Sequence, residues 1–276
     1  MKRVALLIVA LLVVTSCYVK NQRYNPVPRS VVAIEPNGNR VDRVDPACDP
    51  REHACLAFLE FDEMGERWDR NQPQVALDLI QRAKTLSTHP IVVVFVHGWK
   101  NNANDRDGEE NHNVVGFEGV LNFIRTLPKY ASSPIVGIYL SWRGDLIPDY
   151  WPIRRQLSVT NRETAATRIP GSSMTAALTQ IMIQTHSGPP GARLIMVGHS
   201  FGGLILERAL TQAMTDYVLR QTGGAAAGRD NTWADLVVFV NSAAAASEGK
   251  QMLDFLKSRR AAYRSPVEAD RLQRTV

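Results

Sequence analysis

Short apolar runs alternate along the chain with longer segments in which apolar residues recur every three or four positions. The runs have the length of buried strands, and the periodic segments have the spacing of amphipathic helices. This alternation predicts an α/β fold, with a mostly parallel sheet covered by helices on both faces. The expected strands are residues 56–61, 91–96, 135–142, 193–197 and 236–240, and the expected helices are residues 73–86, 114–127, 171–186, 203–220 and 243–257.

The same pattern predicts where the domain begins and ends. Residues 51–258 are expected to form one α/β domain, and residues 18–50, which carry five prolines, a tether and irregular approach. Residues 143–170 have no clear period and lie where a cap insertion is common in such folds; their aromatic side chains contact either a substrate or the core. Residues 259–276 are polar and basic and are expected to be a disordered tail.

Composition and charge argue against some classes of function. The chain has 276 residues, of which 45% are hydrophobic and 21% charged, as in an ordinary globular protein. The formal net charge is +5, but no basic stripe is interleaved with aromatic residues, which argues against nucleic-acid binding. No pattern in the sequence implies a metal or an organic cofactor.

The N-terminus has the pattern of a bacterial export signal. A basic start, Met1 to Arg3, precedes an apolar run at residues 4–14, which is too short to span a bilayer comfortably. The run ends in Val14-Thr-Ser-Cys17, which resembles the bacterial lipobox. This resemblance implies acylation of Cys17 and a lipid anchor in the cell envelope; Tyr18, in place of Asp, favours the outer membrane, facing the periplasm. An uncleaved anchor, or an ordinary signal peptide with a chance cysteine, remains the alternative.

Cys48 and Cys55 are the other two cysteines of the chain. Outside the cytoplasm, two cysteines this close are expected to form a disulfide. Free thiols are the second possibility. A metal site is the third, but it needs more ligands than these two thiols and the nearby His53.

The strongest chemical signal is the stretch from residue 193 to residue 204. An apolar strand leads into Gly198-His199-Ser200-Phe201-Gly202, which fits G-x-S-x-G, and a helical segment follows. This strand, turn and helix are the context of a nucleophile elbow, in which a serine is exposed on a turn too tight for larger flanking residues. An ordinary strand–helix turn with a structural serine is the alternative.

A second motif stands about a hundred residues earlier, where the strand at 91–96 ends in His97-Gly98-Trp99. Together the two motifs resemble the α/β-hydrolase superfamily, in particular bacterial lipases and esterases, over residues 56–258. The resemblance implies Ser200 as nucleophile and the N–H groups of Phe201 and Trp99 as the oxyanion hole. It also implies that His97 is architectural, and that Gly98, Gly198, His199 and Gly202 support the motifs.

The chain departs from this family in its histidines. The family places the catalytic base on a loop after the last strand, whereas no histidine follows Ser200 here. Three interpretations stay open: a chain that lacks the C-terminal part of the fold, a protein that keeps the elbow as a binding pocket, or an enzyme that uses an upstream histidine. The expected function is therefore hydrolysis of a carboxylic ester or lipid-like acyl substrate at the envelope. The alternative is a membrane-tethered binding protein without catalysis.

Overall fold

The computed structural model describes residues 30–99, 101–103, 112–144, 159–171, 173–188, 191–222 and 234–244, together with Lys250 and Asp254. The signal peptide expected at residues 1–17, the tail expected at 259–276 and most of the helix expected at 243–257 lie outside these residues. The expected cap insertion is described at 143–144 and again from residue 159.

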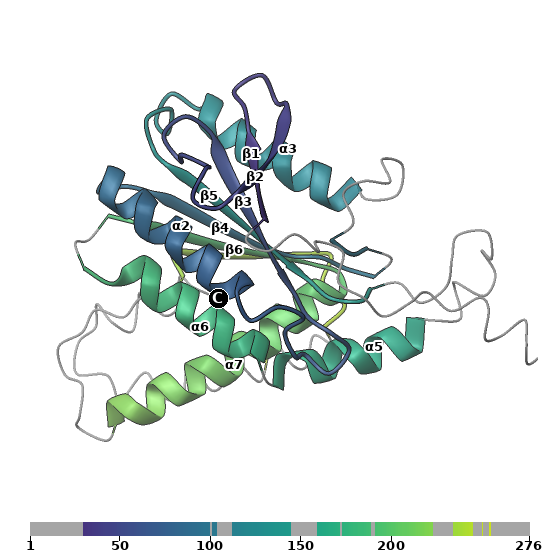
Figure 1. The fold of residues 1–276 in the computed structure, drawn as a ribbon. Coiled ribbons are helices and arrows are strands. Elements are labelled where there is room, and N and C mark those ends of the chain that lie inside the picture. Colours follow the sequence, from purple (N-terminus) through teal and green to yellow (C-terminus); the bar gives the residue numbers. More distant parts are fainter. Residues whose placement is uncertain are drawn as a thin grey trace, which may run out of the picture.

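Seven strands form one sheet, in the order β2-β1-β3-β5-β4-β6-β7 (Figure 1). From β3 to β7 all neighbours are parallel, whereas β1 is antiparallel to both β2 and β3. The sheet is therefore mixed but mostly parallel, and the expected fold class is confirmed. The strands are β1 Ser30–Ile34, β2 Arg40–Val44, β3 Ala54–Glu60, β4 Ile91–Val96, β5 Ile135–Ser141, β6 Arg193–His199 and β7 Leu236–Val240.

Helices cover both faces of the sheet: α3 lies on one face, and α2, α6 and α7 lie on the other (Figure 1). The connection from β4 to β5 crosses the sheet in the opposite direction from the other parallel connections, and right-handed crossovers then place its helix on the opposite face. No helix in the described ranges is long and apolar enough to cross a membrane. The helices are α2 Gln72–Leu86, α3 His112–Thr126, α5 Val159–Arg168, α6 Ser173–His186 and α7 Phe201–Thr222, with a 3-10 turn at Ile169–Gly171.

The side chains of β4 show how the sheet divides the core. Val92, Val94 and Val96 belong to the cluster that α2, α6 and α7 cover, whereas Ile91 and Val93 belong to the cluster beneath α3. Successive residues of a strand point to opposite faces, so a strand that is buried on both sides must be apolar throughout. This requirement explains the uninterrupted apolar runs in the sequence.

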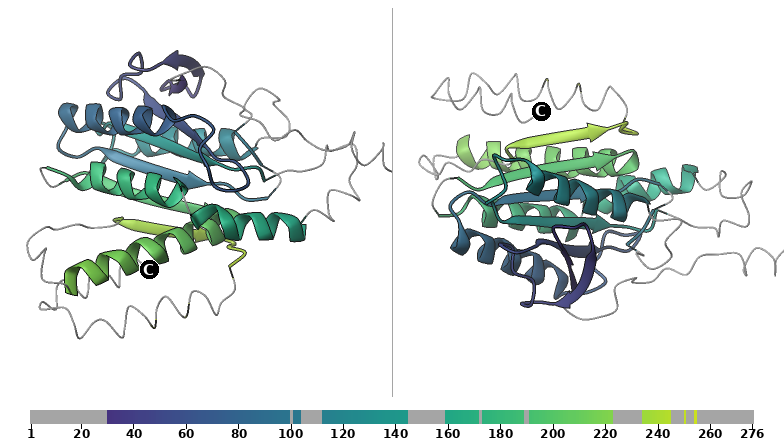
Figure 2. Two further views of the ribbon diagram at one scale, coloured as in Figure 1. Left: turned by 60° about the horizontal axis from the view of Figure 1, so that its bottom comes forward. Right: turned by 90° about the horizontal axis from the view of Figure 1, so that it is seen from above.

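The prediction that residues 18–50 form an irregular approach is wrong for residues 30–44. These residues form the hairpin β1–β2 at one end of the sheet, with β7 at the other end (Figure 2). Val31 to Ile34 are buried, and β1 pairs with β3. The domain therefore begins at β1, before residue 51. A four-residue apolar run between prolines is a weak signal, because pairing with a distant strand decides its conformation.

The other element boundaries differ from the sequence predictions by a few residues. β4 and β7 have the predicted bounds, β6 extends to His199, and α7 begins at Phe201 instead of residue 203. The last two differences matter for the site, because they leave only Ser200 between the strand and the helix.

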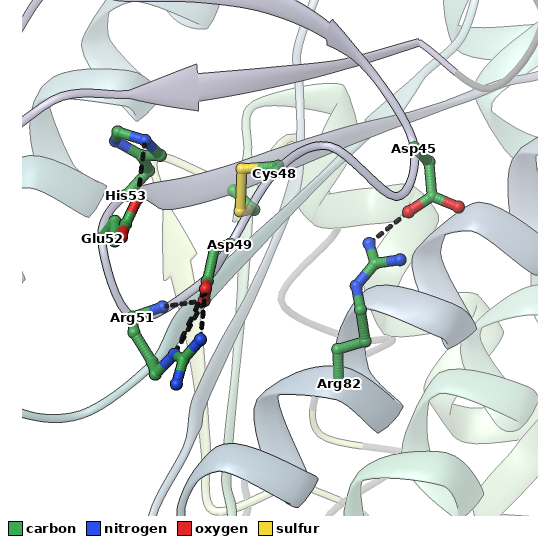
Figure 3. Close-up of a disulfide and its surroundings, with 8 residues drawn as sticks. Asp45, Cys48, Asp49, Arg51, Glu52, His53 and Arg82 are labelled. Carbon is green, nitrogen blue, oxygen red and sulfur yellow. Dashed lines mark hydrogen bonds and ion pairs between the residues drawn. A yellow bond between two sulfur atoms is a disulfide. The ribbon is translucent and has the colours of Figure 1, made fainter.

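A disulfide joins Cys48, in the connection between β2 and β3, to Cys55 of β3, with 6.0 Å between the two Cα atoms (Figure 3). Both cysteines are fully buried. On the same segment, the buried carboxylate of Asp45 forms an ion pair with Arg82 of α2. The disulfide and the ion pair together fasten the connection after the hairpin to the body of the domain.

Candidate active site

The carboxyl ends of β4 and β6 carry the two motif loops and lie side by side at one edge of the sheet. The strands are parallel neighbours, with Val96 opposite Gly198. After β4 the chain passes to α3 on one face, and after β6 it passes to α7 on the other face. In open α/β sheets, ligands bind in the crevice where neighbouring connections diverge in this way.

Ser200 occupies the single-residue turn between β6 and α7 with a left-handed backbone, at a φ of 54°. Such a conformation is uncommon for a residue with a side chain, and it clusters at functional sites. The turn is tight on both sides: a Cβ on Gly198 would lie 2.7 Å from the Cα of Gly203, and one on Gly202 would overlap the carbonyl oxygen of Val96. The spacing of the two motif glycines thus has a steric cause.

Ser200 also precedes a helix of 22 residues. Phe201 is the first residue of α7, so its N–H has no carbonyl four residues earlier in the helix to bind. The N-terminal end of a helix carries a partial positive charge, which stabilises negative charge close to it. The N–H of Phe201 therefore belongs to a region that favours an oxyanion.

Gly98 brings the loop after β4 into contact with this turn. A Cβ on Gly98 would lie 2.8 Å from the Cβ of Ser200 and 2.9 Å from the carbonyl oxygen of His199. Trp99, the other predicted donor, follows directly in the chain. On its other side the loop is supported by Gly144, whose Cβ would lie 2.8 Å from the carbonyl oxygen of Gly98. The structure thus brings the predicted nucleophile and both predicted donor residues to one place.

His97 lies beside Gly98 and is fully buried. Its Nε2 accepts a hydrogen bond from the backbone N–H of Trp142 at 3.0 Å, so Nδ1 carries the proton and donates to the carbonyl of Gly98 at 2.8 Å. The indole N–H of Trp142 donates in turn to the carbonyl oxygen of His97, and the two rings stack. Burial lowers the pKa of His97 from 6.5 to about 4. The ring is therefore neutral and occupied at both nitrogens, as suits an architectural residue.

Two buried arginines that the sequence did not single out lie at the same edge. Arg143 follows β5, Arg162 belongs to α5, and each donates to the Oε1 atom of Glu63, at 2.9 and 3.2 Å. Arg162 also donates to the carbonyl oxygen of Arg143 at 2.9 Å. These bonds hold the segment next to Gly144 in place. The sequence held one signal for Arg143, which is a charged residue directly after an apolar strand. It lies at the carboxyl end of that strand, where the motif loops also lie.

The five remaining histidines lie in three parts of the fold. His53, His89 and His186 precede β3, β4 and β6, so they lie at the amino ends of the strands, at the opposite edge. His199 ends β6, and its Nδ1 has no hydrogen-bond partner among the described residues. His112 begins α3, and its side chain is not described. Within the described part of the chain, no histidine forms a hydrogen bond with the Ser200 hydroxyl.

No group of three or more His, Cys, Asp or Glu side chains within the described ranges is arranged to hold a metal ion. No family model, curated protein or solved structure matches the chain. The structure shows an α/β protein with a seven-stranded, mostly parallel sheet, and no family is identified for it.

Proposed function

We propose that the protein is a serine hydrolase of carboxylic esters or lipid-like acyl substrates, and that it belongs to the α/β-hydrolase superfamily. The observation that carries the proposal is the left-handed Ser200 in a one-residue turn between β6 and α7, in contact with the loop of Gly98. Strain of this kind persists only where the surrounding structure holds it, and it recurs at sites of chemistry.

In the proposed reaction, the Ser200 hydroxyl attacks the acyl carbonyl. The N–H groups of Phe201 and Trp99 bind the oxyanion of the tetrahedral intermediate. The carbon–oxygen bond to the alcohol then breaks, and the alcohol leaves with the proton that the serine gave up as the acyl-enzyme forms. Water attacks the acyl group in turn, the carboxylic acid leaves, and the serine oxygen takes back a proton from the water. The neutral, fully bonded His97 keeps the Gly98 loop in position and takes no proton in this scheme.

A second candidate function is binding without catalysis, by a membrane-tethered protein that keeps the hydrolase fold. This alternative is favoured by one observation: within the described ranges, no histidine is bonded to the Ser200 hydroxyl, whereas activation of a serine requires an adjacent base. A binding protein would use the carboxyl ends of β4 and β6 to bind its ligand and would leave that ligand intact.

Covalent labelling distinguishes the two candidates. A fluorophosphonate probe should modify Ser200, which mass spectrometry of the digested protein would locate, and Ser200→Ala should remove the label. Ser132→Ala, a change at an exposed serine after α3, serves as the matched control and should label like the wild type. A folded wild-type protein in which the probe never reacts at Ser200 would favour the binding protein.

The location proposed for this function is the bacterial envelope, through a lipid on Cys17. The support is the lipobox-like sequence Val14-Thr-Ser-Cys17 behind an apolar run. Radiolabelled palmitate should be incorporated during expression in bacteria, and Cys17→Ala should abolish it. Persistent incorporation in the mutant would remove the anchor from the proposal, whatever the outcome at Ser200.

A further inference from the structure

The turn that follows β7, at residues 241–243, lies against the turn that carries Ser200. The N–H of Ser200 donates to the carbonyl oxygen of Val240 at 3.0 Å, and the N–H of Ala243 donates to the carbonyl oxygen of Ser200 at 3.0 Å. Both backbone polar groups of Ser200 are thus bonded by residues of the second turn or directly before it. The backbone of the serine cannot rotate without breaking these two bonds.

The two turns also share an unusual conformation. Ser200 and Asn241 are the two residues other than glycine with positive φ in the described ranges, at 54° and 46°. Each directly follows one of two neighbouring strands, because His199, the last residue of β6, is paired with Val240, the last residue of β7. Strained residues of this kind are maintained only where their surroundings determine them. Here each left-handed residue lies directly beside the other.

A close contact fixes the distance between the second turn and α7. A Cβ on Gly203 would lie 2.5 Å from the Oγ of Ser242 and 2.8 Å from its Cβ, so only glycine fits at this position. The Ser242 hydroxyl is itself held, because its oxygen accepts a hydrogen bond from the N–H of Ala244 at 3.2 Å. A side chain at position 203 would therefore collide with Ser242.

We infer that residues 240–243 are a positioning element for the nucleophile, with Ser242 against Gly203 as its spacer. The element holds the Ser200 backbone in the left-handed conformation that raises its hydroxyl above the turn. None of its residues takes part in the reaction. The inference rests on the proposed function only in naming Ser200 the nucleophile.

Amide hydrogen exchange in the full-length chain, followed by NMR, tests the element directly. Gly203→Ala should push Ser242 away and lower the protection of the Ser200 and Ala243 amides by about tenfold or more. The amide of Val94 in β4 should stay within about twofold of the wild type. The double variant Gly203→Ala/Ser242→Gly removes the clashing atoms and should restore most of the protection. Unchanged protection at Ser200 in Gly203→Ala, or no recovery in the double variant, would overturn the inference.

A second pair of variants keeps the test valid if Gly203→Ala disturbs the whole fold. Asn241→Gly should preserve both protected amides, because glycine adopts positive φ readily, whereas Asn241→Val should lose them, since a β-branched side chain opposes it. Equal amide protection in these two variants would contradict the positioning role of residues 240–243.

Fluorophosphonate labelling of the same variants separates this inference from the proposed function. Loss of labelling in Gly203→Ala and its return in the double variant, at similar melting temperatures, would support both. A wild type that does not label, with amide protection that still follows the predicted pattern, would refute the proposed function and leave the positioning element intact.

Discussion

The glycines around Ser200 differ from the glycines on α3 in the space beside them. A Cβ on Gly202 would overlap the carbonyl oxygen of Val96 and lie 2.5 Å from that of His97, whereas one on Gly119 would meet nothing within 4 Å. Gly202→Ala should therefore lower the free energy of unfolding by about 2–3 kcal/mol through overpacking. Gly119→Ala should raise it by about 0.5–1 kcal/mol through helix propensity. Urea denaturation of both variants measures the difference, and similar values would contradict the steric argument.

His97 should make the stability of the protein depend on pH. In the unfolded chain it binds a proton near pH 6.5, but in the folded protein only near pH 4, because it is buried. Between these values the unfolded state binds more protons, so stability is lost as the pH falls. The shift corresponds to a loss on the order of 3 kcal/mol.

The measurement is urea denaturation between pH 7 and pH 4, with the wild type compared to His97→Gln. Other titrating groups contribute equally to both proteins, so the difference between the two pH profiles isolates His97. The wild type should lose more stability than the variant across this range. Parallel profiles would show that His97 does not keep a lowered pKa.

The residues of the site could be predicted from the sequence only where a motif holds them together. Ser200, Gly198 and Gly202 are close in the chain and share one turn, so a short pattern reveals them. The contact of Gly203 with Ser242 and the bonds of Glu63 to Arg143 and Arg162 join segments that are far apart in sequence. Such contacts depend on the strand order, which no local pattern contains.

At the scale of elements, α3 offers a direct comparison of its two faces. Leu121 is fully buried and fills the space beside Gly137 of β5, whereas Phe123, two residues later, is 61% exposed. Leu121→Ala should cost about 2–4 kcal/mol because it leaves a cavity in the core. Phe123→Ala should change stability by less than about 0.5 kcal/mol. Thermal or urea unfolding compares the two, and an equally large loss at Phe123 would mean that this face packs against something.

The sequence predicted the apolar strands well and the charged strand β2 poorly. β3, β4 and β5 are buried on both faces almost throughout, and each is mostly apolar. β7 is an apolar run as well, although its residues are partly exposed, and β4 and β7 have the predicted bounds. β2 reads Arg-Val-Asp-Arg-Val and is the outermost strand of the sheet. Its five residues neither form an apolar run nor alternate strictly between charged and apolar. Its extended conformation depends on pairing with β1, and local propensity does not predict such tertiary contacts.

At the scale of the whole molecule, the strand order explains how the two motifs come to lie side by side. They are about a hundred residues apart in the chain, but β4 and β6 are neighbours and their following helices lie on opposite faces. The same order sends His53, His89 and His186 to the far edge, because each precedes a parallel strand. The fold thus brings together the predicted nucleophile and the candidate oxyanion donors, while three of the six histidines lie at the opposite edge.

This distribution leads to a prediction about the missing base. If Ser200 lacks an imidazole partner, nitrophenyl acetate should be hydrolysed only slowly, since loss of a triad base costs several orders of magnitude in serine proteases. Imidazole added to the solution should then accelerate hydrolysis by the wild type, because an imidazole molecule beside Ser200 can accept the serine proton. Ser200→Ala, assayed at the same imidazole concentration, subtracts the direct reaction of imidazole with the ester. Brisk hydrolysis without imidazole that depends on Ser200 would contradict the argument, and substitution of His112 and of His199 would then identify the base.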